Sequence, residues 1–241
     1  MNSQACQHFF RKAPAKILLL FIYIISVNLL AGYSAVWLKF PSLWGASKVF
    51  AEKGFRDTTI ADICEDAHSN MASVNYYYGS KDELYAEVWK KAFHEAIEKF
   101  PPDMQLEEDA APEKRLQALV RSFLHRMLDS GELGYAGQIL LMELANPTET
   151  IEDIKQDAIE PFRKRMISIL RELLGERAEE RDLVFCATSV IHQCMGFGFR
   201  RGKLPPLLRK FERNKLIDAL TEHITVFSLA GIAAVKKQMA L

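Results

Sequence analysis

The residues whose chemistry stands out lie in a short segment without charged side chains, Met71–Tyr76. The amide of Asn75 can donate and accept at once, which is the pattern that reads the N6/N7 edge of adenine in the DNA major groove. Met71 and Ala72 offer the apolar contact that a thymine methyl group accepts. With Val74 turned inward, the segment predicts a helix face that contacts bases through Met71, Ala72, Ser73, Asn75 and Tyr76.

Polar residues beside this segment are candidates for the DNA backbone. Thr59, Tyr77 and Lys81 are placed for phosphate contacts, which position a protein without reading sequence, and Asn70 joins the predicted DNA-binding set. Ordinary solvated surface is the alternative for each of them. From residue 46 to residue 100, seven Lys and Arg stand against ten Asp and Glu, a net charge of minus three. Affinity therefore cannot rest on a large basic patch.

The segment is predicted to be the second of two short consecutive helices. Apolar residues over Ile60–Ala67 and Met71–Tyr76 predict two helices that are separated only by residues 68–70, a spacing typical of a helix-turn-helix. Thr58 and Thr59 precede the first helix and Asn70 precedes the second, where a side-chain oxygen can accept from an unpaired backbone N–H. The apolar residues expected to pack these helices are Phe50, Phe55, Ile60, Ile63, Val74, Tyr78 and Leu84.

Three blocks in this region share the spacing of a known family: Phe50 with Gly54-Phe55, the run Thr58–Ile63, and the run Asn75–Lys81. Over about forty residues the segment resembles the DNA-binding domain of the TetR family of bacterial transcriptional regulators. The resemblance implies a helix-turn-helix followed by a helical domain that binds an effector and dimerises. The partners it implies are a palindromic double-stranded operator, a second copy of the chain, and a small molecule that releases the operator.

The segment also departs from the family pattern. His68 stands where the turn usually has glycine, Asn75 replaces a common tyrosine, and Tyr77-Tyr78 replace a usual His-Phe pair. The base preferences of relatives therefore cannot be transferred to this chain.

The rest of the chain predicts helices only, because it contains no strand-like alternation and no internal repeat. We expect an all-α protein with three parts: an atypical N-terminal segment over 1–45, the helix-turn-helix domain over 46–90, and an effector-binding and dimerisation domain over 91–241. The expected helices beyond the helix-turn-helix are Lys81–Phe100, Glu113–Asp129, Tyr135–Ala145, Thr150–Leu174 (bent or restarted at Pro161), Asp182–Arg200 and Asn214–Lys237.

The last two predicted helices are apolar on more than one side. Such helices must be covered on more than one face, and a partner chain can supply the second cover. The TetR resemblance implies that they pair across a two-fold axis, which predicts a homodimer; ordinary core helices of a monomer are the alternative. Within the family, Ile159–Phe162 and Cys194–Arg201 are similar to the CecR subgroup.

An effector pocket is expected in the C-terminal helices. Aromatic, thioether and polar side chains there would suit an apolar organic ligand, although such residues are more often plain core. The predicted set is His125, Met142, Glu143, Phe162, Met166, His192, Gln193 and Met195.

An enzyme is not predicted. The sequence has no glycine-rich phosphate loop, no HExxH or GxSxG motif and no carboxylate cluster at catalytic spacing. The four cysteines show no CxxC pair, which favours a reducing cytoplasm, and Cys186 and Cys194 are expected to be buried rather than to bind a metal. No catalytic residue, metal or cofactor is therefore expected.

The first forty-five residues leave three interpretations open. Ile17–Leu38 has no charged residue over twenty-two positions, long enough for a membrane helix. That interpretation makes the chain a membrane-tethered helical binding protein with impaired or no DNA binding, or a regulator anchored in the inner membrane with its DNA-binding domain in the cytoplasm. A frameshift or aberrant gene start is the second interpretation, since nothing before Ala46 resembles the family. An apolar helix packed on the protein is the third.

Overall fold

The described part of the chain is helical, which confirms the predicted all-α class. The computed structural model describes residues 43–67, 69–107, 109–129, 131, 134–199 and 204–239, and no strand occurs in these ranges. A helix over residues 43–57 comes first. It is followed by α3 Ile60–Asp66, α4 Met71–Tyr78, α5 Lys81–Lys99, α6 Pro112–Leu128, α7 Gly134–Ala145, the 3-10 turn η1 Glu149–Ile151, α8 Glu152–Leu174, α9 Glu180–Phe199, the 3-10 turn η2 Leu208–Lys210, and α10 Arg213–Gln238.

The helix-turn-helix is held by apolar side chains that belong to the main hydrophobic cluster of the protein. Phe50 and Ile63 are fully buried, and Val74 from α4 is nearly so. The ring of Tyr85 on α5 lies 4.7 Å from the ring of Phe50 between centroids. Helices 43–57, α3 and α4 are thereby packed together and against the first turns of α5.

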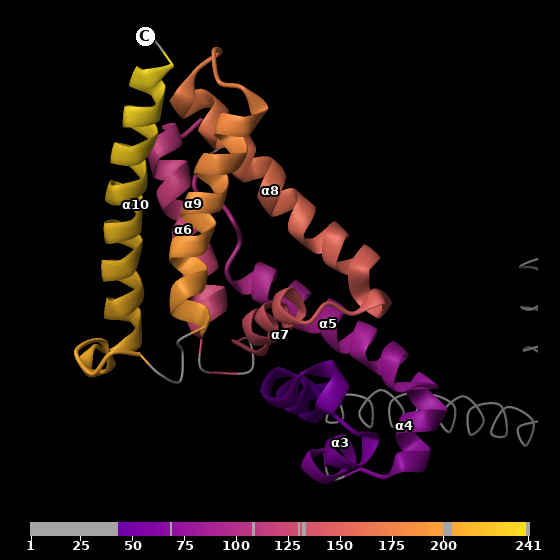
Figure 1. Ribbon diagram of the computed structural model, residues 1–241. Helices are drawn as coiled ribbons and strands as arrows, with labels where there is room; N and C mark the ends of the chain where they lie inside the picture. The colour runs from indigo at the N-terminus through magenta and orange to yellow at the C-terminus, as the bar shows by residue number, and fades with distance from the viewer. Residues whose placement is uncertain are drawn as a thin grey trace, which may run out of the picture. The chain divides into compact units, whose positions relative to one another are not determined.

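The helix α5 leads from the helix-turn-helix to the C-terminal helices. Figure 1 shows it running from the end of α4 to the vicinity of α7, and it contacts α7 and α8. The rings of Trp89 and Phe93 stack along it with centroids 4.6 Å apart. Because α5 continues through residue 90, one continuous helix crosses the domain boundary that the sequence predicts there.

The C-terminal part is organised around α6. This helix contacts α7, α8, α9 and α10, and Figure 1 shows α6, α9 and α10 side by side. Its apolar face recurs every three or four residues, as an amphipathic helix requires. The buried members of that face include Leu116, Leu119, Val120, Phe123, Leu124 and Met127.

One local expectation needs correction, and one glycine has a structural role. The helix α8 is not restarted at Pro161. This proline is exposed to solvent and lies inside one continuous helix. Helix 43–57 includes Gly45, a residue type disfavoured in helix interiors. A Cβ at Gly45 would lie 2.8 Å from the Cβ of Ala67, so the close approach of this helix to the end of α3 requires glycine.

The predicted membrane segment Ile17–Leu38 lies outside the described residues, as does His68 in the turn. Within the ranges that the structure describes, α10 is the one helix whose length and apolar composition would suffice to cross a membrane. It contacts α6, α8 and α9 through its buried face. Packing in a helical bundle accounts for the apolar residues of that buried face.

Candidate functional site

The helix α4 presents one face to solvent and one to the core. Met71, Ala72, Asn75 and Tyr76 are exposed, with 83% of Tyr76 accessible, and Ser73 is half-buried. Val74 faces inward, as predicted. The side chains predicted to contact bases therefore share a free surface on an uncharged helix.

Two predicted DNA contacts are also helix caps. The Thr59 hydroxyl accepts from the N–H of Asp62 at 3.1 Å, and the Asp62 carboxylate accepts from the N–H of Thr59 at 2.9 Å. Asn70 caps α4 by accepting from the N–H of Ser73 at 2.7 Å. Hydrogen bonds from Lys53 and from Thr59 hold the pKa of Asp62 well below its usual range. These contacts stabilise the N-termini of α3 and α4 in the absence of DNA.

Lys81, which the sequence predicts as a phosphate contact, also makes contacts within the protein. Its ammonium donates to the carbonyl oxygens of Phe55 at 2.9 Å and Thr58 at 3.0 Å, and lies 4.3 Å from the centre of the Phe55 ring. A cation at the C-terminal end of helix 43–57 satisfies carbonyls that have no partner in the helix. Lys81 therefore ties the start of α5 to the first helix.

The junction between α4 and α5 depends on Gly79. Its φ is +75°, and a Cβ there would lie 2.3 Å from a carboxylate oxygen of Glu83. We expect Gly79→Ala to lower the free energy of unfolding by about 1–2 kcal/mol, because a left-handed conformation disfavours any Cβ. Urea unfolding followed by circular dichroism would measure the loss. Gly196→Ala is the matched control, since a Cβ at this position in α9 meets nothing within 4 Å and should leave stability unchanged or raise it. Equal losses in both variants would contradict the role given to Gly79.

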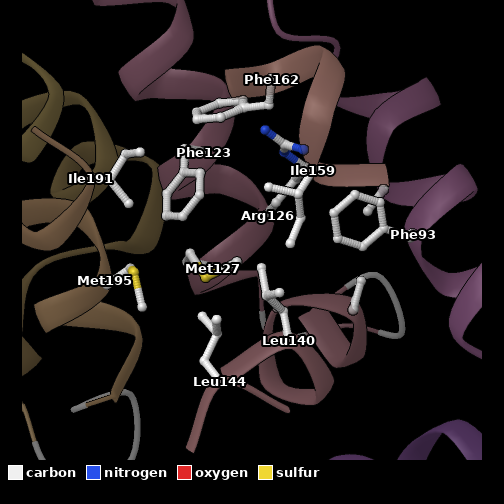
Figure 2. Close-up of a pocket in the computed structure, with 13 residues that line it drawn as sticks. Phe93, Phe123, Arg126, Met127, Leu140, Leu144, Ile159, Phe162, Ile191 and Met195 are labelled. Atoms are coloured by element: carbon white, nitrogen blue, oxygen red, sulfur yellow. The ribbon is translucent and has the colours of Figure 1, made fainter. Parts of the chain in front are cut away.

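A cavity of about 180 Å³ lies among α5, α6, α7, α8 and α9. Figure 2 shows Phe123 and Phe162 near Arg126 on one side and Met127, Leu140 and Leu144 on another. Its lining is apolar apart from one guanidinium. The lining residues are Phe93, Ala96, Phe123, Arg126, Met127, Ala136, Gly137, Leu140, Leu144, Ile159, Phe162, Ile191 and Met195.

Two of the residues predicted for the effector pocket, Phe162 and Met195, line this cavity. The prediction did not include Arg126, the one charged residue of the lining. A signal was present: Arg126 follows Phe123 by three positions and Leu119 by seven, so it falls on the apolar face of α6.

Comparisons with known proteins agree with this arrangement. The family model described as "Bacterial regulatory proteins, tetR family" matches residues 43–88, which hold the helix-turn-helix. The model described as "HTH-type transcriptional dual regulator CecR, C-terminal domain" matches residues 112–232, half of the chain. The chain belongs to the TetR family. It is a DNA-binding transcriptional regulator rather than an enzyme, and its C-terminal domain is of the CecR type.

Individual relatives of this TetR-family chain are distant. The HTH-type transcriptional dual regulator CecR of Shigella flexneri is 24% identical over 168 residues, which cover 66% of this chain and 74% of the relative. A TetR-like regulator from Rhodococcus sp. RHA1 has a TM-score of 0.59 at 19% identity, covering 80% of this chain and 96% of that one. A TetR transcription regulator from Haloarcula marismortui has a TM-score of 0.55 at 18% identity, covering 80% and 97%. These structures support the fold.

Several residues that were predicted for the effector pocket of this TetR-family protein lie elsewhere. Glu143 is buried in a polar network: its carboxyl accepts from the Tyr85 hydroxyl at 2.7 Å and from the N–H and hydroxyl of Thr148, both at 3.1 Å. Met142 is half-buried, with its sulfur near Gly54 of the first helix. Both residues join α7 to the helix-turn-helix rather than line the cavity.

The remaining predicted residues are spread over other surfaces. His125 stacks on Phe100 with ring centres 4.6 Å apart, and burial lowers its pKa. Met166 is fully buried in the core. His192 is exposed on α9, while Gln193 donates to the Ser228 hydroxyl at 3.1 Å across the groove between α9 and α10. The periodicity of α9 therefore did not reveal which of its faces turns toward the cavity.

The cysteines of α9 are buried. Burial raises the pKa of Cys194 to about 12, so its thiol stays protonated at neutral pH. Among the residues that the structure describes, no three His, Cys, Asp or Glu side chains are grouped as metal ligands.

Proposed function

We propose that this regulator binds a palindromic operator as a homodimer, acts as a repressor, and is released when a small molecule occupies the cavity. The observation that supports this proposal is the position of two features along α5. The exposed, capped and uncharged face of α4 lies at one end of this helix, and the cavity lies at the other end. A DNA-binding repressor of this kind works in the cytoplasm, where its operator lies.

An apolar surface on α9 and α10 supports the homodimer. Phe185 is 63% exposed, and Val226 and Phe227 are 64% and 65% exposed. Large apolar side chains gathered on two adjacent helices mark a surface that a protein partner covers. A second copy supplies an identical surface, and two-fold symmetry matches a palindromic site.

The helix α5 supports the coupling between cavity and DNA. Phe93 lines the cavity on α5, and Tyr85 on the same helix contacts Phe50 in the helix-turn-helix. A ligand shifts the population of DNA-competent dimers only if it binds the two arrangements with different affinity. A ligand that displaces Phe93 would tilt α5 and change the spacing of the two α4 helices.

Operator binding is tested with the full chain and DNA from beside its own gene. Fluorescence anisotropy should show a complex that weakens as salt rises, because phosphate contacts release counterions. No complex at low salt, with protein that circular dichroism shows to be folded, would reject the proposal.

The different roles given to Asn75 on α4 and Lys81 on α5 lead to a further prediction. Asn75→Ala should cost about 1–3 kcal/mol of operator affinity and should relax base preference at one position of each half-site. Lys81→Met should instead lower the unfolding temperature, because it removes the cation from two carbonyls. Binding of both variants to the operator and to a set of single-base variants would separate the two effects. Unchanged base preference in Asn75→Ala would contradict base reading by this residue.

A further inference from the structure

The cavity contains a charged group that the protein itself leaves incompletely satisfied. Arg126 is 6% exposed, and its Nη2 has no hydrogen-bond partner among the described residues. Within the same part of the chain, its Nε donates to the Ser122 carbonyl over 3.4 Å, which is a long and weak hydrogen bond. Figure 2 shows the guanidinium within the ring of cavity residues, beside Phe162 and Ile159.

Aromatic contacts offset part of the cost of burying this charge. The guanidinium carbon lies 5.3 Å from the centre of the Phe162 ring and 5.9 Å from that of Phe123. Such contacts offset only a fraction of the free energy that it costs to bury an unpaired charge. Burial lowers the pKa of Arg126 to about 10, so the group still carries its charge at neutral pH.

The remaining surface of the cavity defines the body of a ligand. Phe93, Phe123, Leu140, Ile191 and Met195 present only carbon and sulfur to it. The volume of about 180 Å³ slightly exceeds the ~150 Å³ of an apolar cavity that accommodates benzene. A body of one aromatic ring, or a branched aliphatic group of similar size, fits this space.

We propose that the effector is a small organic acid whose single carboxylate pairs with Arg126 and whose ring-sized apolar body fills the cavity. The inference rests on the proposed effector function of the cavity. A planar guanidinium matches a carboxylate through two parallel hydrogen bonds. A phosphate would need further donors, which the lining does not supply, and a cationic ligand would be repelled by the buried charge.

The test compares benzoate with benzamide, a neutral ligand of nearly the same shape. Isothermal titration calorimetry on the full chain should give at least a tenfold tighter dissociation constant for benzoate. Arg126→Met should abolish this preference, and Arg126→Lys should retain part of it. Arg121→Met is the matched control, because Arg121 lies on the same helix but is exposed and pairs with Asp218, and it should preserve the preference.

The outcomes separate this inference from the proposed function. Equal binding of benzoate and benzamide to the wild type, or no binding of benzoate at millimolar concentration, would overturn the organic-acid assignment even if Arg126→Met failed to fold. Retention of the preference by folded Arg126→Met would overturn the role of Arg126. Arg126-dependent binding of benzoate without release of the operator in anisotropy would support the acid site and reject the cavity as the effector switch.

Discussion

Replacing Phe227 with glutamate is expected to convert the proposed homodimer to monomers and to weaken operator binding by about 100-fold or more. Phe227 is 65% exposed on α10, next to the exposed Val226, so the substitution should be tolerated by the isolated fold. In the dimer it would bury two like charges against an apolar surface. Each monomer would then bind one half-site alone and lose the gain in affinity that linked sites provide.

Light scattering with size exclusion would measure the mass, and anisotropy would measure operator binding. Leu207→Glu is the matched control: Leu207 is 70% exposed but lies outside α9 and α10, so the same type of substitution should leave the mass and the affinity unchanged. If the Phe227→Glu protein remains dimeric, the proposal that α9 and α10 form the dimer surface is wrong. Equal loss in both variants would point to a general effect of added charge.

The helix pattern was largely predictable because it depends on local spacing. The apolar residues of α6 repeat over several turns, and the predicted helix Glu113–Asp129 differs from the observed Pro112–Leu128 by one residue at each end. Capping was also predictable, since Asn70 needs only a donor three residues later. Local chemistry determined these features, so the sequence alone contained them.

Which residues line the cavity depends on contacts between distant parts of the chain, and no local sequence pattern encodes these contacts. The rotation of α9 about its axis places Met195 at the cavity and His192 in solvent, although both belong to the same apolar helix. Lys81 reaches carbonyls 26 and 23 residues earlier in the chain, so its partners depend on how α5 packs against the first helix. The apolar pattern of α6 did not predict Arg126 as a lining residue, because charged side chains are rarely buried without a partner.

Replacing Glu143 with alanine is expected to lower the free energy of unfolding by about 3 kcal/mol. The substitution leaves the buried Tyr85 hydroxyl and both donors of Thr148 without their acceptor, and each such loss costs about 1–3 kcal/mol. For a domain of this size, about 3 kcal/mol corresponds to a fall in the unfolding temperature of about 6–12 °C. Differential scanning calorimetry would measure the change.

Two further variants connect this network to the switch. Glu143→Gln has nearly the same shape, keeps one acceptor oxygen for Thr148 and places its NH2 donor against the Tyr85 hydroxyl, which can accept in turn. It should therefore recover most of the lost stability. Tyr85→Phe removes only the hydrogen bond that joins α5 to α7, since its ring still packs 4.7 Å from Phe50 between centroids. If movement of α5 carries the signal, Tyr85→Phe should bind the operator as the wild type does but require a different effector concentration for release. An unchanged release curve, together with the expected loss of stability in Glu143→Ala, would show that this network stabilises the junction without transmitting the signal.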